Sequence, residues 1–316
     1  MQKWEKLNPG DIVDIVAPAS GTAKEVVEAA QKVLRDHGFT PRVPQEILEP
    51  VFYHSNSDKK RLEQLKEALL ANDSKAIWCL RGGYGSNRLL PGLSRLKKPK
   101  KAKVLIGISD LTSIHLFLNQ KWKWASLHAS LIDRLTDGRL PKDNVAEIFS
   151  VLQGEQKTVE FVKLIAMNRA AKKIKMRKAP IVGGNLVTLQ SSLGTPWAVQ
   201  TKGNFLFIEE LAERGYRIDR ILVHLQQSGK LQGCKGILLG HFIGGDEPKN
   251  EAESGVVKNL VVEALQRFSD EQNSIPVWSG IESGHGENLR TLPFGMPASL
   301  TQKNGEIILS VETGCR

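Results

Sequence analysis

"KVLIGISDLTSIHLFL", residues 103–118, joins two structural patterns at a single point. The apolar run 104–108 is typical of a buried strand, and apolar residues then recur at helical spacing over 111–118. Ser109 and Asp110 stand at the junction. A serine at this point is either an ordinary helix N-cap or an exposed nucleophile on a strand-to-helix elbow. The local sequence alone favours the N-cap.

The alternation of strand and helix continues on both sides of this junction. The apolar runs predict strands over 11–19, 75–80, 205–210 and 236–242. Helical periodicity predicts helices over 23–38, 57–73, 216–229 and 255–270. An Asn-Gly pair between short apolar runs predicts a β-hairpin near the C-terminus. The alternation predicts an α/β fold, because near-continuous apolar strands belong to parallel sheets covered on both faces.

The alternation weakens and turns basic after residue 150, which indicates a boundary between domains. We therefore expect an N-terminal parallel-sheet α/β domain over 1–155 and a connecting segment over 156–178. A C-terminal mixed α/β domain should follow over 179–316. Ligands of parallel α/β sheets bind outside the carboxyl ends of the strands.

Composition excludes several classes of protein. The 316 residues are 41% hydrophobic and 25% charged, and no stretch approaches the roughly 20 apolar residues that span a bilayer. We expect no membrane insertion and, because the first residues lack a signal-peptide pattern, a cytoplasmic location. The three cysteines have no metal-ligand spacing, and Cys79 and Cys234 fit buried apolar positions.

The net charge of +10 raises the question of nucleic-acid binding. Much of the basic charge lies in two stretches, 96–103 and 169–178. Neither stretch has the interleaved aromatic residues of a single-strand binding surface, and no zinc-finger or RNA-recognition signature occurs. We interpret both stretches as solvated basic faces and expect no nucleic-acid partner.

A cluster of glycines follows the predicted strand 75–80. Gly82, Gly83 and Gly85 would let the backbone approach a ligand and direct N–H groups at developing negative charge. A tight turn also needs glycine, so the cluster alone is weak evidence. It does not match the phosphate-binding loop of nucleotide hydrolases, because no Gly-Lys-Ser/Thr follows.

A serine nucleophile needs a base and an acid that orients the base. Among the seven histidines, His285 is flanked by Gly284 and Gly286, which lets an imidazole project from a loop at close quarters. Glu209 and Glu210 end an apolar strand, where a carboxylate could serve as the acid or simply terminate the strand. The residues alone do not choose between the two glutamates.

Six ordered blocks resemble one family, the LD-carboxypeptidases of serine peptidase family S66, which include microcin C immunity proteins. The blocks run through nearly the whole chain: "GDIVDIVAPAS", "RGGYGSNRLLP", "LIGISDLTSIH", "GGNLVTLQSSLGTP", "LFIEELAERGYRIDRIL" and "GHGENLRTLPFG". The Gly-x-Ser-x-Gly motif of the α/β-hydrolases is not matched, because Leu111 replaces its second glycine.

The resemblance implies a Ser–His–Glu triad of Ser109, His285 and Glu209, with Glu210 as the fallback acid. It further implies an oxyanion hole of backbone amides from the Gly82–Gly83 loop and Asp110, and an active site in the cleft between the two domains. No metal and no cofactor are expected. A terminal carboxylate is best bound by arginine, and the candidate substrate-binding residues are Arg81, Tyr84, Arg88 and Arg290.

The resemblance predicts an enzyme that removes the terminal D-alanine from murein tetrapeptides during cell-wall recycling. Its partner is then a small peptide substrate, and homodimers are what the family suggests. One alternative is an immunity-type peptidase that cleaves aminoacyl-sulfamoyl or aminoacyl nucleotides. A more distant alternative is a non-catalytic module that binds anionic ligands or nucleic acid.

Overall fold

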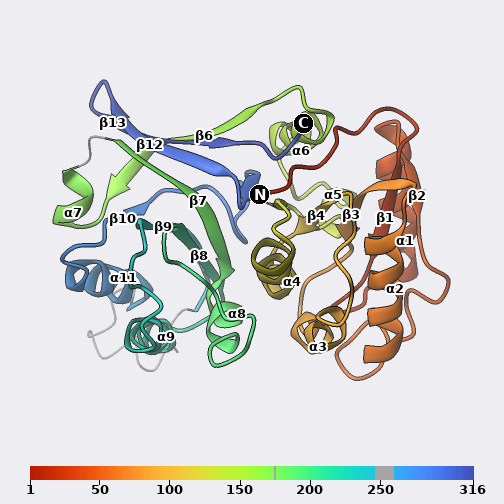
Figure 1. The fold of residues 1–316 in the computed structure, drawn as a ribbon, viewed down its shortest axis with the longest axis horizontal. Helices are drawn as coiled ribbons and strands as arrows, with labels where there is room; N and C mark the ends of the chain where they lie inside the picture. The colour runs from red at the N-terminus through yellow and green to blue at the C-terminus, as the bar shows by residue number, and fades with distance from the viewer. Residues whose placement is uncertain (174–175, 246–259) are drawn as a thin grey trace. The chain divides into compact units, whose positions relative to one another are not determined.

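A computed structural model describes residues 1–173, 176–245 and 260–316 (Figure 1). These residues form two compact units. The first unit consists of Met1–Val159, Glu287–Met296 and Glu312–Arg316. The second consists of Glu160–Gly286 and Pro297–Val311. Both units are built from strands and helices, so the predicted α/β class is confirmed.

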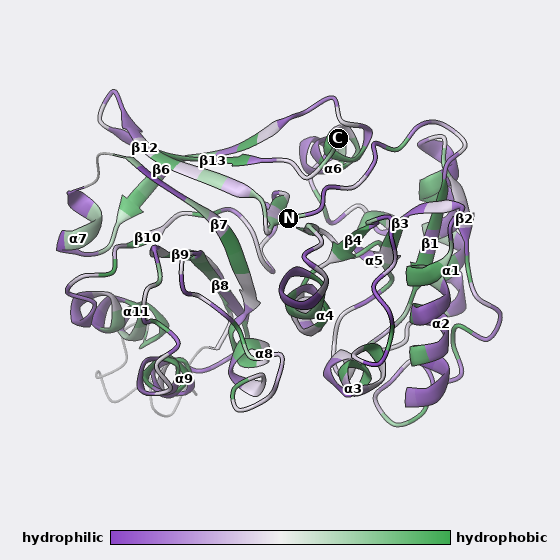
Figure 2. Ribbon diagram, in the orientation of Figure 1, coloured by the Kyte–Doolittle hydropathy of each residue, from purple (hydrophilic) through white to green (hydrophobic). Residues whose placement is uncertain are grey.

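The first unit is organised around a six-stranded sheet with the order β11-β5-β4-β3-β1-β2. Its strands are β1 (Ile12–Val16), β2 (Thr40–Arg42), β3 (Ser74–Cys79), β4 (Val104–Gly107), β5 (Ser126–His128) and β11 (Leu292–Phe294). Five strands are parallel, and only the edge strand β11 runs antiparallel to its neighbour β5. Every residue of β4 is buried, as its unbroken apolar sequence predicts. Figure 2 shows β1 and β4 in the hydrophobic colour.

The helices of the first unit connect its parallel strands or, in the case of the last two, follow β5. They are α1 (Lys24–Asp36), α2 (Asp58–Leu70), α3 (Leu90–Leu93), α4 (Thr112–Phe117), α5 (Asp133–Thr136) and α6 (Lys142–Gln153). Short turns of other helical types lie at η1 (Ser86–Leu89), η2 (Ser109–Leu111) and η3 (Leu118–Trp122). Helix α1 buries Val27, Ala30 and Leu34, whose spacing places them on one face. Helix α2 begins where the Ser57 hydroxyl accepts a hydrogen bond from the Lys60 amide.

The second unit contains a closed barrel with the strand order β10-β6-β13-β12-β7-β8-β9. Its strands are β6 (Thr158–Ala166), β7 (Met176–Asn185), β8 (Phe205–Leu211), β9 (Gly236–Ile243), β10 (Val277–Ser279), β12 (Pro297–Lys303) and β13 (Glu306–Glu312). The described helices are α7 (Arg169–Lys172), α8 (Leu186–Ser191), α9 (Gly215–Gln227) and α11 (Leu260–Glu271). Strands β7, β8, β9 and β10 are parallel, whereas β12 is antiparallel to β7 and β13. The second unit is therefore of mixed type, as predicted.

The C-terminal hairpin is confirmed. Strands β12 and β13 pair antiparallel from Ala298↔Val311 to Lys303↔Glu306. Asn304 and Gly305 between them both have positive φ, 51° and 83°. That backbone is the one for which an Asn-Gly turn is suited.

Two expectations about basic stretches are wrong. Residues 156–178 are not a plain connection, because they contain β6, α7 and the first residues of β7. The period-two alternation of β6 is interrupted at Val162 and Lys163, which are both exposed, and Lys163 has a positive φ of 58°. This interruption conceals the strand in the sequence. Lys103 is not part of a solvated face either: it is 4% exposed, and its ammonium donates to the Ala68 carbonyl oxygen (2.5 Å) and to the Ser74 hydroxyl (2.6 Å). Burial lowers the pKa of Lys103 to about 8.

Other predictions about single segments hold. Cys79 and Cys234 are buried and free. The predicted helix 255–270 is described from Leu260 onward as α11, and its first residues, 255–259, lie outside the described part of the chain. Residues 174–175 of the second basic stretch lie outside it as well.

Candidate active site

Ser109 lies on a strained elbow between β4 and the helical turn η2. Strand β4 ends at Gly107, and η2 begins at Ser109. The backbone of Ser109 is left-handed, with a φ of 67°. L-residues avoid this region because their Cβ approaches the backbone, and such outliers concentrate at functional positions. Local backbone stability therefore does not explain why a serine occupies position 109.

The N-cap explanation of Ser109 is wrong. The residue that precedes η2 is Ile108, the residue that precedes α4 is Leu111, and neither helix start is capped by a side chain. Within the first unit the Ser109 hydroxyl has no hydrogen-bond partner among the described residues, and Ser109 is half-buried. Its hydroxyl is therefore available for chemistry.

The glycine loop after β3 lies against Ser109. A Cβ atom added to Gly82 would lie 2.9 Å from the Ser109 Cβ and 3.2 Å from its Oγ. Gly83 has a φ of 97°, and a Cβ there would meet the Ser20 Oγ at 2.2 Å. Only glycine permits this approach of backbone to the serine. The backbone of Gly82 therefore lies in close contact with the Ser109 side chain.

The backbone amides of Gly82, Gly83 and Asp110 donate no hydrogen bond within the described residues. Buried amides are normally paired, so the amides of Gly82 and Asp110, which are both buried and have no acceptor among the described residues, are informative. The Asp110 side chain is used differently: its carboxylate accepts from the Ser86 amide (2.7 Å), and the Ser86 hydroxyl donates to the Asp110 carbonyl oxygen (2.5 Å). Burial raises the pKa of the Asp110 carboxyl. Asp110 thus fixes η1 to the elbow and leaves its amide free.

In the second unit, His285 is hydrogen-bonded to a fully buried carboxylate. Its Nδ1 lies 2.6 Å from Oε2 of Glu209, which has an exposed fraction of 0%. Because a carboxylate can only accept here, Nδ1 carries the proton and Nε2 is the basic nitrogen. Gly284 has a φ of 119°, and a Cβ there would lie 2.9 Å from Glu209 Oε2. The glycine before His285 is therefore what admits the imidazole to the carboxylate.

Glu210 has a different role from Glu209. Its Oε1 accepts from the Asn185 side chain and the Leu211 amide, and its Oε2 accepts from the Val187 amide, each at 2.8 Å. These bonds join the end of β8 to the start of α8. Glu210 is therefore a structural group, and of the two glutamates only Glu209 contacts His285.

His115, which directly follows the elbow region in sequence, is not suited to act as a base. It is fully buried, with Nε2 and Nδ1 each 2.8 Å from the Gly107 carbonyl oxygen and the Ser126 hydroxyl, respectively. Burial lowers its pKa to about 4. Both ring nitrogens are engaged, so His115 is a neutral structural side chain.

The candidate arginines differ in their partners. The Arg88 guanidinium pairs with Asp58 at 2.7 Å. The Arg290 Nε lies 3.0 Å from the Glu147 carboxylate, which also accepts from the Thr291 amide. Arg81 is exposed and has no ion pair within the described residues. Tyr84, which follows the glycine loop, is 44% exposed.

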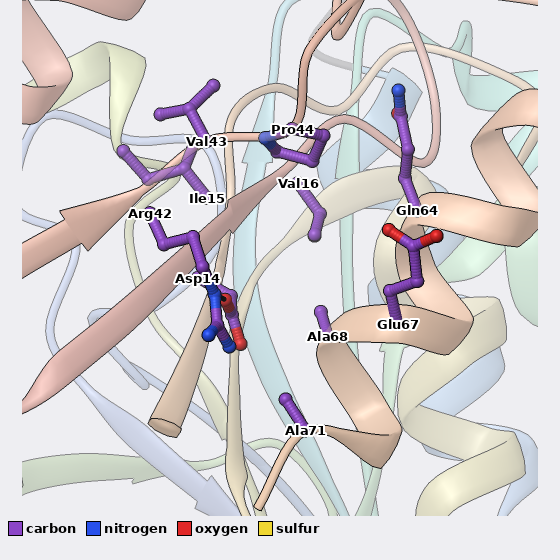
Figure 3. Close-up of a pocket in the computed structure, with 10 residues that line it drawn as sticks. All are labelled: Asp14, Ile15, Val16, Arg42, Val43, Pro44, Gln64, Glu67, Ala68 and Ala71. Carbon is purple, nitrogen blue, oxygen red and sulfur yellow. Dashed lines mark hydrogen bonds and ion pairs between the residues drawn. The ribbon is translucent and has the colours of Figure 1, made fainter. Parts of the chain in front are cut away.

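A separate cavity of about 320 Å³ lies in the first unit between β1, β2 and α2 (Figure 3). The Arg42 guanidinium and the buried Asp14 carboxylate form an ion pair at one end, and Gln64, Glu67 and Ala68 line the wall that α2 provides. None of the predicted site residues lines this cavity. It is therefore distinct from the candidate catalytic groups.

Sequence reasoning missed two supporting serines of the candidate site. Ser20 accepts a hydrogen bond from the Tyr84 amide (3.2 Å), and its own amide donates to the Gly82 carbonyl oxygen (3.0 Å). Ser86 holds Asp110 from the other side. Both serines lie inside blocks that carry the family resemblance, which was the available signal.

The described residues contain neither a candidate metal-binding cluster nor a candidate membrane-spanning helix. Within 1–173, 176–245 and 260–316, no group of three or more His, Cys, Asp or Glu side chains is arranged to hold a metal ion. Across the same residues, no helix has the length and apolar character needed to cross a membrane.

The family follows from comparisons with known proteins. The profile of the LD-carboxypeptidase N-terminal domain matches residues 13–129, and that of the C-terminal domain matches residues 178–300. A Rickettsia prowazekii protein with a provisional carboxypeptidase name is 36% identical over 232 residues, which are 73% of this chain and 72% of the relative. The chain belongs to the LD-carboxypeptidase family.

The chain is similar both to tetrapeptide carboxypeptidases and to a microcin immunity protein. The murein tetrapeptide carboxypeptidase of Pseudomonas aeruginosa is 28% identical over 307 residues, 95% of each chain. The crystal structure of muramoyltetrapeptide carboxypeptidase from Oxalobacter formigenes matches with a TM-score of 0.80 and 27% identity, over 95% of this chain and 98% of that one. The microcin C7 self-immunity protein of Escherichia coli is 26% identical over 93% of this chain and 90% of its own.

Proposed function

We propose that this protein is a serine LD-carboxypeptidase that removes the terminal D-alanine from murein tetrapeptides. The observation that carries the proposal is the 2.6 Å hydrogen bond between His285 and the fully buried Glu209. It is the pairing of base and orienting acid that serine hydrolysis requires. The strained, unpaired Ser109 supplies the candidate nucleophile. Relatives whose names specify murein or muramoyl tetrapeptides support the choice of substrate.

In the proposed reaction, Nε2 of His285 takes the proton of the Ser109 hydroxyl as its oxygen attacks the carbonyl carbon before D-alanine. Glu209 holds the imidazole in the required tautomer and stabilises the imidazolium that forms. The amides of Gly82, Gly83 and Asp110 stabilise the negative oxygen of the tetrahedral intermediate. The imidazolium then protonates the leaving amine of D-alanine, and water hydrolyses the acyl-enzyme with His285 again acting as base.

Recognition of the free carboxylate falls to Arg81 in this proposal. Arg88 and Arg290 are already paired with carboxylates, and breaking such a pair to bind substrate would cost part of the binding energy. Arg81 directly precedes the Gly82–Gly83 loop and, among the described residues, forms no ion pair within 4 Å. Arg81→Gln should raise KM for the tetrapeptide more than it lowers kcat.

The proposal is tested by incubating the purified protein with murein tetrapeptide and following the loss of one alanine by mass spectrometry. Chiral analysis of the released amino acid must give the D-isomer. Ser109→Ala protein is the control for a contaminating peptidase. Aspartyl sulfamoyl adenosine, found in a complex of the microcin immunity protein, is assayed in parallel. Cleavage of that compound without cleavage of tetrapeptide would replace the proposal by the immunity-type alternative.

We also propose a cytoplasmic homodimer that needs neither cofactor nor nucleic acid. The supporting argument is the resemblance to the LD-carboxypeptidase family. Sedimentation equilibrium of the purified protein tests the dimer, and fractionation of expressing cells tests the location.

A further inference from the structure

An exposed aromatic tip lies in the first unit, outside the catalytic groups described above. Val51 and His54 form a tight turn through two backbone hydrogen bonds, His54 N to Val51 O (3.0 Å) and Val51 N to His54 O (3.2 Å). Phe52 and Tyr53 occupy the tip, with exposed fractions of 81% and 66%. Two adjacent aromatic side chains exposed to solvent form an apolar surface, and such surfaces often mark binding sites.

The backbone of Phe52 is also unusual. Its φ is 59°, a left-handed conformation that suits glycine or asparagine at such a turn position and not a bulky side chain. A phenylalanine at position 52 is therefore unfavourable for two reasons: its backbone is strained, and its apolar ring is exposed to solvent. Strain of this kind is tolerated where it serves a function. The combination of a left-handed backbone and high exposure makes Phe52 a candidate for contact with a ligand.

The aromatic tip is fastened to the loops that surround Ser109. The Ser55 amide donates to the Ala19 carbonyl oxygen (3.0 Å), and the Ser55 hydroxyl donates to the Ala17 carbonyl oxygen (2.6 Å). The next residue along that loop, Ser20, is bonded to Gly82 and Tyr84. The turn is therefore held by the same loop that holds the candidate oxyanion hole.

The rings form a row that begins beside the glycine loop. Tyr84 lies 5.3 Å from the His54 ring, His54 lies 6.2 Å from Phe52, and Phe52 lies 4.1 Å from Tyr53, all between ring centroids. His54 is the buried member, 7% exposed, with Nε2 lacking a hydrogen-bond partner among the described residues. The other three rings, Tyr84, Phe52 and Tyr53, are exposed. We call these three exposed rings the aromatic row.

We propose that the aromatic row binds the acyl side of the substrate and that its outer members, Phe52 and Tyr53, stack on the sugar ring attached to the amino end of a murein tetrapeptide. The inference rests on the proposed function. An exopeptidase accommodates a single residue beyond the scissile bond, so a surface that extends several residues away from the nucleophile belongs to the acyl side. The two steps of 5.3 and 6.2 Å place the Phe52 ring at most about three residues of extended peptide from the Tyr84 ring, at about 3.3 Å per residue. Three residues precede the last bond of a tetrapeptide.

The test compares free tetrapeptide with N-acetylmuramyl-tetrapeptide. For the Phe52→Ala/Tyr53→Ala protein, the ratio of kcat/KM for the sugar-linked substrate to that for the free peptide should fall about tenfold, which is what the loss of two aromatic contacts implies. The change should appear mainly in KM. Leu70→Ala, which removes an exposed apolar side chain at the end of α2, is the matched control and should leave the ratio unchanged.

A second variant separates binding from structure. Phe52→Asn removes the ring but suits the left-handed backbone, so its melting temperature should equal or exceed that of the unchanged protein while the substrate ratio falls. A ring that served only to stabilise the fold would show the opposite pattern. An unchanged ratio in both variants would overturn the proposal.

Binding measurements keep the inference separate from the proposed function. Ser109→Ala protein should bind the sugar-linked tetrapeptide more tightly than the free peptide in calorimetry, and the Phe52→Ala/Tyr53→Ala change should abolish the difference. If the unchanged protein cleaves neither substrate but this binding difference is found, the proposed carboxypeptidase function is rejected, whereas the proposed binding role of the aromatic row is supported. Equal affinities would overturn the aromatic row. Conversion of a dimer to a monomer by the double substitution would overturn it too, by assigning the rings to a subunit interface.

Discussion

At the scale of single residues, Ser109 combines backbone strain with a hydroxyl that has no hydrogen-bond partner in the described part of the chain. Ser109→Ala should lose nearly all turnover, by about 10⁴-fold or more, because triad members act as a unit. Its stability should stay close to that of the unchanged protein, since no cap is removed. Ser109→Gly should be equally inactive and more stable by up to about 1 kcal/mol, because glycine relieves the left-handed strain. Steady-state kinetics with murein tetrapeptide measures the loss of turnover, and urea unfolding measures the change in stability.

A loss of about 1 kcal/mol in Ser109→Ala, with turnover retained, would contradict the nucleophile and restore a capping role for this serine.

Glu209 and Glu210 are neighbours with separable roles. Glu209→Gln should lower kcat by about 10⁴-fold, because the amide no longer favours the required tautomer of His285. Glu210→Gln should instead lower the free energy of unfolding by about 1–3 kcal/mol, since it replaces a carboxylate that accepts three hydrogen bonds. Parallel steady-state kinetics and urea unfolding distinguish the two effects. The reverse pattern would transfer the triad role to Glu210.

At the scale of elements, α4 is tied to the sheet through one histidine. His115 bonds to the Gly107 carbonyl oxygen in β4 and to the Ser126 hydroxyl in β5. Its imidazole is neutral in the folded protein because burial lowers its pKa to about 4 from an ordinary 6.5. The elbow that carries Ser109 and the strands beside it therefore depend on an uncharged His115.

This histidine should make stability fall with acid. Above pH 6.5 its contribution is fully present; it is lost as the pH falls from 6.5 towards 4, because the unfolded chain takes up the proton first. The whole loss is about 3 kcal/mol. Urea unfolding of the unchanged protein and of His115→Gln at several pH values in this range checks it, and the variant should lack this part of the pH dependence. His224→Gln, at an exposed position, is the control; equal pH dependence in all three proteins would contradict the argument.

At the scale of the whole molecule, the first unit is assembled from both ends of the chain. Strand β11 pairs with β5 through Leu292↔His128 and Phe294↔Ser126. The terminal residues 312–316 return as well, since the Trp4 amide donates to the Gly314 carbonyl oxygen and the Arg316 amide donates to that of Trp4. A predicted domain of residues 1–155 therefore lacks part of the sheet found in this unit.

A fragment of residues 1–159 should consequently fail to fold cooperatively. It would expose the edge of β5 and the side chain of Trp4, which is 0% exposed in the full chain, and unpaired edges favour aggregation. Thermal unfolding followed by circular dichroism, with binding of a hydrophobic dye, compares the fragment with the full chain. A sharp unfolding transition of the fragment would show that the C-terminal segments are dispensable.

The basic surface of the whole molecule makes a separate prediction. Neutralising Lys97, Lys98, Lys100 and Lys101 together should leave stability and peptidase activity unchanged, because all four are exposed. Any binding to nucleic acid should be weak and lost at moderate salt. Lys103→Met should instead destabilise by about 1–3 kcal/mol, since it leaves buried polar partners unsatisfied. Loss of activity in the fourfold variant would give the basic surface a part in substrate capture.

The sequence by itself determined the alternation of strands and helices, the strand-to-helix junction at residues 108–111 and the Asn-Gly hairpin, because each depends on periodicity or turn chemistry within a few residues. It did not determine the role of Ser109 at that junction, because the local sequence favoured an N-cap. Strand β6 was not predicted because its period-two alternation is interrupted at Val162 and Lys163, which are both exposed. Only the tertiary structure decided that Glu209 and not Glu210 contacts a histidine 76 residues away, which arginines are paired, and that β11 joins the first sheet. Those choices depend on contacts between distant segments, and neither spacing nor composition specifies which of two adjacent carboxylates faces a given loop.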